Sequence, residues 1–280
     1  MGDWTNHNIQ ANGIHLNVHR TGGNKPPLVL SHGFTDIGLC WRRVTLELES
    51  DYDVVMYDAR GHGLSSGPES GYGAEVHAAD LAGLIGALRL DQPVVMGHSM
   101  GANTAAITAA EYPDLVRAVI LEDPPWFLPV EKPQTEPDDD TDDVRPPNPW
   151  QMRAQQFKGM SREDLMSFCR STNPTWDEID IEDWADSKVQ FNLAIFDVTQ
   201  TPVEPTWWQE TVRLIQAPLL LLTADPERGA LVTEEAARLV LELGSQVRVV
   251  EISGAGHSIR REQFEPYMAA VTAFLKDHPV

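Results

Sequence analysis

Residues 97–101 read Gly97-His98-Ser99-Met100-Gly101, and this stretch decides how the chain is interpreted. It follows the apolar run Pro93-Val94-Val95-Met96 and precedes an alanine-rich segment of helical composition. A sharp turn from a strand into a helix strains the backbone of its middle residue, exposes that side chain, and needs small neighbours where backbones approach closely. The pattern therefore predicts that Ser99 is a nucleophile at a strand-to-helix turn.

Apolar strand-like runs and helical patterns alternate on both sides of this motif. Strands with apolar residues on both faces belong to mostly parallel sheets, and a strand–helix–strand order implies right-handed crossovers with helices on both faces. A hairpin is expected before them, within the first 35 residues. The main predicted strands are 28–30, 53–57, 94–96, 118–121, 218–222 and 246–250, and the helices between them are 41–50, 73–90 and 100–112.

The alternation stops at Pro124 and returns at Pro218. We therefore expect a core of residues 1–123 and 211–280, and a helical lid of residues 124–210 that includes an acidic, proline-rich loop at 131–149. Six of the eight tryptophans lie in the lid, and most of these rings are expected to pack its interior. The candidates for lining a substrate pocket are His98, Trp126, Trp150 and Trp184.

Four stretches, in this order along the chain, resemble the α/β-hydrolase superfamily. Ser31-His32-Gly33-Phe34 resembles its oxyanion loop, and Asp58-Ala59-Arg60-Gly61-His62-Gly63-Leu64-Ser65 resembles the loop after its fourth strand. Residues 97–101 resemble its nucleophile elbow, and Gly254-Ala255-Gly256-His257 resembles the segment that carries its catalytic histidine. The resemblance implies an α/β-hydrolase fold: a mostly parallel central sheet, helices on both faces, and a helical cap inserted after the sixth family strand.

A serine hydroxyl needs an adjacent base, and His257 is the candidate because it follows the last strand in a glycine-containing turn. Three residues compete as the acid that orients this histidine. Asp225 ranks first because it ends a buried strand, Asp123 second because some relatives take their acid there, and Glu227 third because counting from the strand places it at the usual family position. The backbone N–H groups of Phe34 and Met100 are expected to form the oxyanion hole.

These residues favour hydrolysis of a carboxylic ester or lactone through an acyl-enzyme, in which Ser99 attacks, His257 carries the proton and Asp225 orients His257. C–C bond hydrolysis and cofactor-free perhydrolysis are alternatives on the same triad. A ligand-binding receptor with vestigial hydrolysis is an alternative of another class. No cofactor or metal is expected, because the histidines lack the spacing of a zinc site. The tryptophan-rich lid favours a small, largely apolar or aromatic substrate.

Composition narrows the possible partners. The formal net charge of −21 makes nucleic acid and anionic membranes unfavourable partners. No apolar run is long enough for a membrane span, and the N-terminus lacks the basic and apolar segments of a signal peptide. Two cysteines make no disulfide framework, so a cytoplasmic setting is expected. The oligomeric state stays open.

Overall fold

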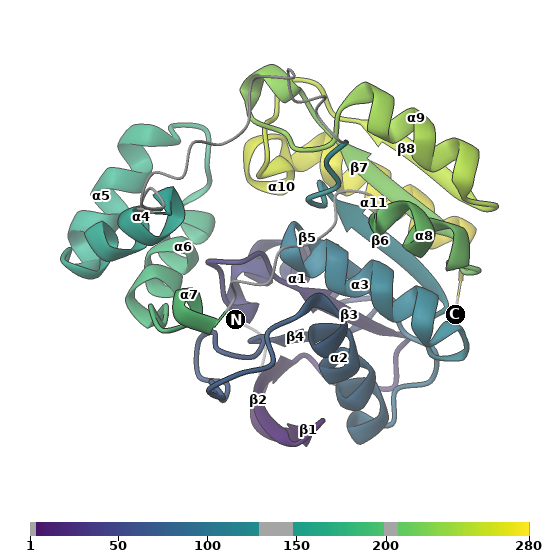
Figure 1. The fold of residues 1–280 in the computed structure, drawn as a ribbon, viewed down its shortest axis with the longest axis horizontal. Helices are drawn as coiled ribbons and strands as arrows, with labels where there is room; N and C mark the ends of the chain where they lie inside the picture. The colour runs from purple at the N-terminus through teal and green to yellow at the C-terminus, as the bar shows by residue number, and fades with distance from the viewer. Residues whose placement is uncertain (1–3, 129–147, 199–206, 280) are drawn as a thin grey trace, which may run out of the picture.

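The computed structural model describes residues 4–128, 148–198 and 207–279. One eight-stranded sheet, in the order β1-β2-β4-β3-β5-β6-β7-β8, runs through the molecule (Figure 1). The β1–β2 hairpin and the β2–β4 pair are antiparallel, and the other pairs are parallel. This architecture confirms the expected α/β-hydrolase fold class. The strands are β1 Thr5–Ala11, β2 Ile14–Arg20, β3 Pro27–Ser31, β4 Asp53–Tyr57, β5 Val94–His98, β6 Ala118–Glu122, β7 Leu219–Thr223 and β8 Val247–Glu251.

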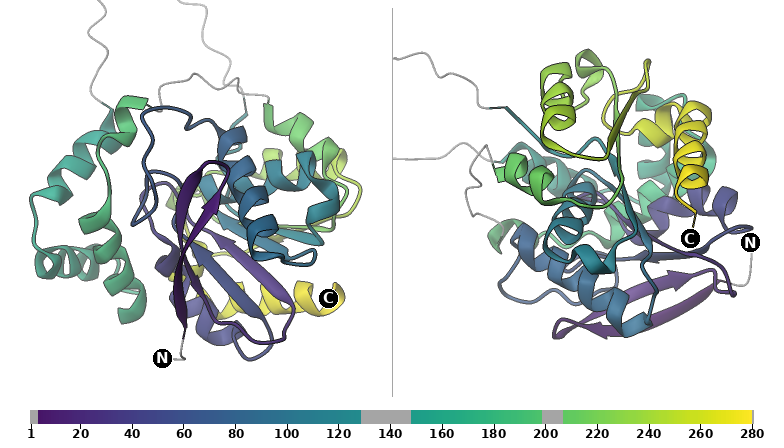
Figure 2. Two further views of the ribbon diagram at one scale, coloured as in Figure 1. Left: turned by 90° about the horizontal axis from the view of Figure 1, so that it is seen from below. Right: turned by 90° about the vertical axis from the view of Figure 1, so that its right-hand side faces the viewer.

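Helices cover both faces of the sheet (Figure 2). Alternate strand residues point to opposite faces, so Val95 joins a core cluster with α2 and α3, whereas Val94 and Met96 join another with α1 and α11. The parallel strands β3 to β7 are buried along their whole length, which explains their continuous apolar runs. The core helices are α1 Arg42–Leu48, α2 Ala74–Leu88, α3 Met100–Glu111, α9 Glu234–Leu243, α10 Ile259–Glu262 and α11 Phe264–Asp277, with short 3-10 turns η1 Gly38–Trp41, η2 Pro113–Leu115 and η3 Pro226–Arg228.

Four cap helices stand to one side of the sheet, at the left of Figure 1. They are α4 Pro149–Lys158, α5 Arg162–Thr172, α6 Glu178–Gln190 and α7 Ile195–Val198. The cap has a small apolar interior of its own, which includes Phe157, Leu165 and Trp184. The predicted acidic loop lies outside the described residues from 131 to 147.

The next helix, α8 Trp207–Leu214, packs on α3 and belongs with the core. Trp208 is fully buried there and stacks on Trp126, with 5.4 Å between the ring centroids. The structure therefore places residues 207–210 beside the core, although the sequence pattern assigned them to the lid. The sequence pattern did not indicate this placement, because tryptophans that pack on the core and tryptophans that pack inside a lid look the same in the sequence.

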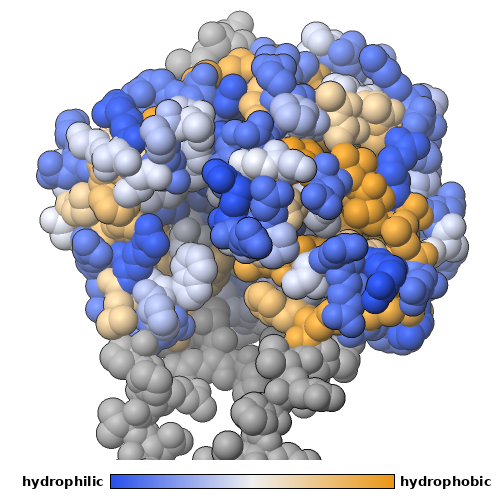
Figure 3. Space-filling model, turned by 90° about the horizontal axis from the view of Figure 1, so that it is seen from above, coloured by the Kyte–Doolittle hydropathy of each residue, from blue (hydrophilic) through white to orange (hydrophobic). Residues whose placement is uncertain are grey.

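The face of the molecule seen from above carries an apolar patch on one side. With the cap at the left, hydrophilic side chains dominate the cap, and apolar surface gathers on the opposite side, toward α8 and α9 (Figure 3). Leu214 of α8 and Leu241 of α9 are each half exposed. Within the described ranges, no helix has both the length and the apolar character that crossing a membrane would require.

Buried histidines make the stability of the fold dependent on pH. Burial lowers the pKa of His62 to about 4 and that of His77 to about 3. An unfolded chain protonates both near pH 6.5, so it binds more protons than the native state as the pH falls from about 6.5 toward 3. The stability that these neutral rings contribute is present above pH 6.5 and is lost through that window.

We expect a His77→Gln variant to lose this dependence in part. Between pH 7 and pH 5, the free energy of unfolding of the wild type should fall by about 2 kcal/mol more than that of the variant. Urea unfolding at the two pH values measures the difference. Other groups change stability with pH in the opposite direction, such as Asp183, whose pKa burial raises to about 7. These groups are present in both proteins, so their effects cancel in this comparison. Parallel pH dependences in the two proteins would contradict the expectation.

Candidate active site

Ser99 lies at the turn from β5 into α3, as predicted. Its backbone angles are φ 53° and ψ −118°, a strained conformation for a residue other than glycine. The Ser99 N–H donates to the carbonyl oxygen of Glu122 at 3.0 Å, which ties the turn to the end of β6. The serine itself is partly exposed, whereas residues 94–98 before it are buried. The turn thus presents one hydroxyl above a buried sheet.

Two glycines make the turn possible by close approach. A Cβ atom at Gly97 would lie 2.1 Å from the carbonyl oxygen of Gly101, and one at Gly101 would lie 2.1 Å from the carbonyl oxygen of Ser31. Both distances are far below van der Waals contact, and the atoms in the way are backbone atoms. The glycines at positions 97 and 101 are therefore required by packing.

Gly97→Ala and Gly101→Ala should each lower the free energy of unfolding by about 3 kcal/mol or more, because the backbone must shift to admit the methyl group. Gly86→Ala is the matched control. Gly86 lies in α2 with open space around it, and alanine there should raise stability by about 0.5–1 kcal/mol. Thermal unfolding and the yield of folded protein measure both effects. An equal response of the three variants would show that the turn tolerates side chains.

His257 and Asp123 form the second part of the site. Nδ1 of His257 lies 2.6 Å from Oδ2 of Asp123, whose side chain is fully buried. The same carboxylate accepts the N–H of Leu231 at 2.8 Å and the N–H of Val232 at 2.9 Å. Because Nδ1 donates to Asp123, Nε2 is the nitrogen that remains to take a proton. Asp123 is thus held by its own neighbours and in turn fixes the tautomer and orientation of His257.

The preference for Asp225 as the partner of His257 is wrong in this structure. Oδ2 of Asp225 accepts the backbone N–H of Gly254 at 2.8 Å, and Glu227 is exposed on η3. The physical reason is strand order. β6 lies directly beside β5, which leads to Ser99, whereas β7 lies one strand farther away. Asp123 follows β6 with φ 44°, whereas Asp225 follows β7 and braces the loop before His257.

The loop after β3 lies beside the serine, as the oxyanion prediction requires. A Cβ atom at Gly33 would lie 3.5 Å from Cβ of Ser99, so Gly33 is next to the serine. Phe34 is the residue that follows Gly33 in the chain. Met100 is the first residue of α3, where backbone N–H groups have no partner within the helix. Among the residues that the structure describes, the N–H groups of Phe34 and Met100 make no backbone hydrogen bond. Both are therefore candidates for binding a developing negative charge.

His98 is a buried neighbour of His257, and its contacts do not support its predicted place in a substrate pocket. The ring is buried, and Nε2 donates to the carbonyl oxygen of His257 at 2.9 Å. The two imidazole rings lie 4.7 Å apart. Burial and the nearby Arg260 charge lower the pKa of His98 well below its usual value, so the ring is neutral. His98 therefore connects the serine turn to the segment that carries His257.

The three candidate tryptophans have other surroundings. Trp126 is fully buried and donates its indole N–H to Oδ1 of Asn103 at 2.9 Å. Trp184 packs inside the cap, edge-on to Phe157, and Trp150 is 59% exposed. None of these contacts places a ring beside Ser99, so their prediction as pocket residues is not supported.

Aromatic residues that the sequence reasoning missed lie against the oxyanion loop instead. The ring of Phe34 makes edge-to-face contacts with Phe191 and Phe196, at centroid distances of 5.8 and 5.5 Å. Both partners are buried near the end of the cap, in a cluster with Ile195. No spacing in the sequence marks Phe191 and Phe196, because they are far from Phe34 along the chain and meet it only in the folded structure.

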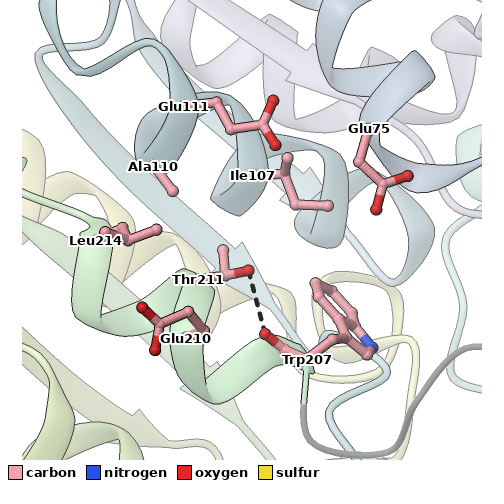
Figure 4. A pocket seen from close by; sticks show the side chains of 8 residues that line it. All are labelled: Glu75, Ile107, Ala110, Glu111, Trp207, Glu210, Thr211 and Leu214. Atoms are coloured by element: carbon pink, nitrogen blue, oxygen red, sulfur yellow. Dashed lines mark hydrogen bonds between the residues drawn. The ribbon is translucent and has the colours of Figure 1, made fainter.

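A separate pocket opens between α2, α3 and α8 (Figure 4). It lies along the C-terminal half of α3, and the carboxylates of Glu75, Glu111 and Glu210 surround it together with Trp207. Neither Ser99, His257 nor Asp123 lines it. This pocket has no nucleophile–base pair and is not the candidate active site.

Comparison with known proteins agrees with this geometry. The family model described as alpha/beta hydrolase fold matches residues 26–260. The chain belongs to this family. It is 29% identical to N-formylmaleamate deformylase of Pseudomonas putida over an alignment of 282 positions that covers 98% of this chain and 97% of the relative. A stretch of 110 residues, 39% of each protein, is 41% identical to 2-(acetamidomethylene)succinate hydrolase of Mesorhizobium japonicum.

Solved structures of similar proteins share the fold of this alpha/beta hydrolase. The crystal structure of E-2-(acetamidomethylene)succinate hydrolase superposes with a TM-score of 0.76 at 24% identity, over 98% of this chain and 99% of the other. That of N-formylmaleamic acid deformylase from Pseudomonas putida gives a TM-score of 0.74 at 26% identity, over 95% and 100%. The protein is a hydrolase of this family.

Proposed function

We propose that this alpha/beta hydrolase is a serine hydrolase that cleaves the acyl C–N bond of a small, carboxylate-bearing amide. Ser99 is the nucleophile, His257 the base and Asp123 the acid. The observation that carries the proposal is the 2.6 Å contact between His257 and a buried Asp123, in a fold that presents Ser99 on a strained turn. This arrangement supplies the base that a serine hydroxyl needs at neutral pH.

The reaction proceeds in two halves. Oγ of Ser99 attacks the acyl carbon while Nε2 of His257 takes its proton, and the N–H groups of Phe34 and Met100 bind the oxyanion. The C–N bond then breaks as His257 returns the proton to the leaving nitrogen, which leaves an acyl group on Ser99. Water, deprotonated by His257, attacks this ester and frees the serine. Asp123 stabilises the imidazolium in both halves.

The choice of an amide rests on the relatives. The names N-formylmaleamate and 2-(acetamidomethylene)succinate each combine an N-acyl group with at least one carboxylate. The first relative matches over nearly the whole chain, so the likeness includes the cap. Esters and lactones, the classes that the sequence favours, react by the same steps with oxygen as the leaving atom. C–C bond hydrolysis, perhydrolysis and a receptor role remain competing proposals.

The aromatic cluster at Phe34 favours a small acyl group. Phe191 and Phe196 of the cap pack against the ring of Phe34, and the backbone N–H of Phe34 is the one that we propose to bind the oxyanion. Bulky rings at this position leave less room beside Ser99 for a long acyl chain. A formyl or acetyl group fits this expectation better than a fatty acyl group does.

A panel of substrates, assayed with wild type and with Ser99→Ala, tests the proposal. It holds N-formylmaleamate, 2-(acetamidomethylene)succinate, p-nitrophenyl acetate, p-nitrophenyl octanoate and an aromatic lactone. We expect the highest kcat/KM on one of the two amides, acetate above octanoate among the esters, and no turnover by the variant. A kcat/KM for an ester or lactone that exceeds both amides by about 100-fold would overturn the amide assignment. Absence of any turnover would favour the receptor role.

A further inference from the structure

Core histidines contact two carbonyl groups of the oxyanion loop. Nδ1 of His32 donates to the carbonyl oxygen of Gly33 at 2.8 Å. This carbonyl group and the N–H of Phe34 belong to the same peptide group. Nε2 of His62 contacts the carbonyl oxygen of Phe34 itself. Both rings are buried, and burial lowers the pKa of each below its usual value. Nδ1 of His62 also lies 2.9 Å from the carbonyl oxygen of Arg60, and a neutral ring has a single N–H to share between these two carbonyl groups. Histidines of the core thus contact two successive carbonyl groups of the loop.

The third carbonyl group is contacted from the cap. Lys188, near the end of α6, reaches the loop with its ammonium group. Nζ lies 2.7 Å from the carbonyl oxygen of Thr35, 2.8 Å from Oγ1 of Thr35 and 3.4 Å from Oδ1 of Asp36. An ammonium group has three N–H donors, and these three acceptors match them. Lys188 is 5% exposed, so the contact is shielded from water.

A buried cluster of charges fixes the position of Asp36. Its Oδ2 lies 3.0 Å from a guanidinium nitrogen of Arg261 and 3.5 Å from one of Arg260. Although burial opposes ionisation, these two cations and Lys188 hold the pKa of Asp36 well below its usual value. Lys188 is one of three cations around Asp36, so we expect its removal to shift the balance of charge at Asp36 and to loosen the loop beside it.

The contacts that dock the cap elsewhere do not reach this loop. Arg42 pairs with Glu182 and Asp183, and Arg43 pairs with Asp180 at 3.1 Å. These ion pairs join α1 to α6 and lie on the same cap helix as Lys188. The cap therefore meets the oxyanion loop through the polar contact of Lys188 and the aromatic contacts of Phe191 and Phe196 with Phe34, and it has separate ion pairs with α1. The two roles of α6, docking and bracing, are separable by mutation.

We propose that Lys188 is a positioning residue for the oxyanion hole, through which the cap holds the backbone of Phe34 in place. The inference rests on the proposed function, because an oxyanion forms only if Ser99 is the nucleophile. Lys188 acts through Thr35 and Asp36 and does not touch the reacting atoms. With it, three successive carbonyl groups, from Gly33 to Thr35, are in contact with side chains.

Lys188→Met tests the inference, with Arg43→Met as the matched control that removes a docking ion pair. With p-nitrophenyl acetate, we expect Lys188→Met to lower kcat at least about tenfold, with KM changed less than about threefold. Its affinity for a trifluoromethyl ketone, which forms an oxyanion at Ser99, should fall by a similar factor. Arg43→Met should keep kcat within about threefold of wild type. Equal losses of kcat in both variants, or a loss of thermal stability alone in Lys188→Met, would overturn the inference.

Two further measurements separate the possible failures. Thr35→Val removes one acceptor of Lys188 and should lower kcat in the same direction by a smaller factor, which keeps the test valid if Lys188→Met does not fold. Labelling of wild type with a fluorophosphonate probe tests the proposed function itself. A wild type that reacts at Ser99, combined with full kcat in both Lys188→Met and Thr35→Val, would overturn the positioning role alone. A wild type that does not react would overturn the proposed function.

Discussion

Asp123→Asn should lower kcat by about 10⁴-fold. The carboxylate accepts the Nδ1–H of His257 at 2.6 Å and two backbone N–H groups. An asparagine amide can offer one oxygen to these three donors, and its NH₂ group stabilises the wrong tautomer of the imidazole. It also cannot offset the positive charge that His257 acquires. Steady-state kinetics on the best substrate of the panel measures the loss, with thermal unfolding to show that the variant folds.

Asp225→Asn is the matched control for this prediction. Asp225 accepts the N–H of Gly254 through one oxygen, and an asparagine carbonyl can replace that bond. We expect kcat to stay within about tenfold of wild type, because only the loop before His257 is affected. If Asp225→Asn lost the larger factor, the acid would be the residue that the sequence pattern ranked first, and the geometry would not describe the working enzyme.

Ser99→Ala should lower kcat by about 10⁶-fold, because no acyl-enzyme can form without the hydroxyl. Binding of substrate should persist, since the oxyanion loop, His257 and the cap are unchanged. Isothermal titration with substrate measures binding, and product analysis measures turnover. Ser171→Ala removes an exposed hydroxyl that donates to the carbonyl oxygen of Phe168, and it should leave kcat unchanged. Activity in Ser99→Ala above about 1% of wild type would place the nucleophile elsewhere.

Local patterns were sufficient to predict the sheet and the serine turn. The continuous apolar runs that end at Ser31, Tyr57 and Gly97 are buried parallel strands, as their composition indicates. Gly97 and Gly101 mark positions where backbone atoms leave no room for a side chain, and their spacing around Ser99 is visible in the sequence. The patterns that predict these features are local in the sequence, although the atom that excludes a side chain at Gly101 belongs to Ser31 of β3.

The acid and the loop contacts depend on which strands and helices become neighbours. Asp123 and Asp225 both follow buried strands, and only the strand order places β6, and not β7, next to the strand of Ser99. Lys188 and Thr35 are 153 residues apart, and nothing in their spacing predicts contact. Tryptophan composition was also ambiguous, because Trp126 and Trp208 pack within the core and Trp184 packs within the cap.

Reaction with a fluorophosphonate probe, followed by intact-mass measurement and peptide mapping, tests the central claim most directly. The account predicts one adduct per chain, on Ser99, formed much more slowly in Asp123→Asn and at the wild-type rate in Ser171→Ala. Slow labelling of Asp123→Asn would show that the buried carboxylate activates the serine through His257. An adduct on another residue, or no adduct on a folded wild type, would contradict the assignment of Ser99 as an activated nucleophile.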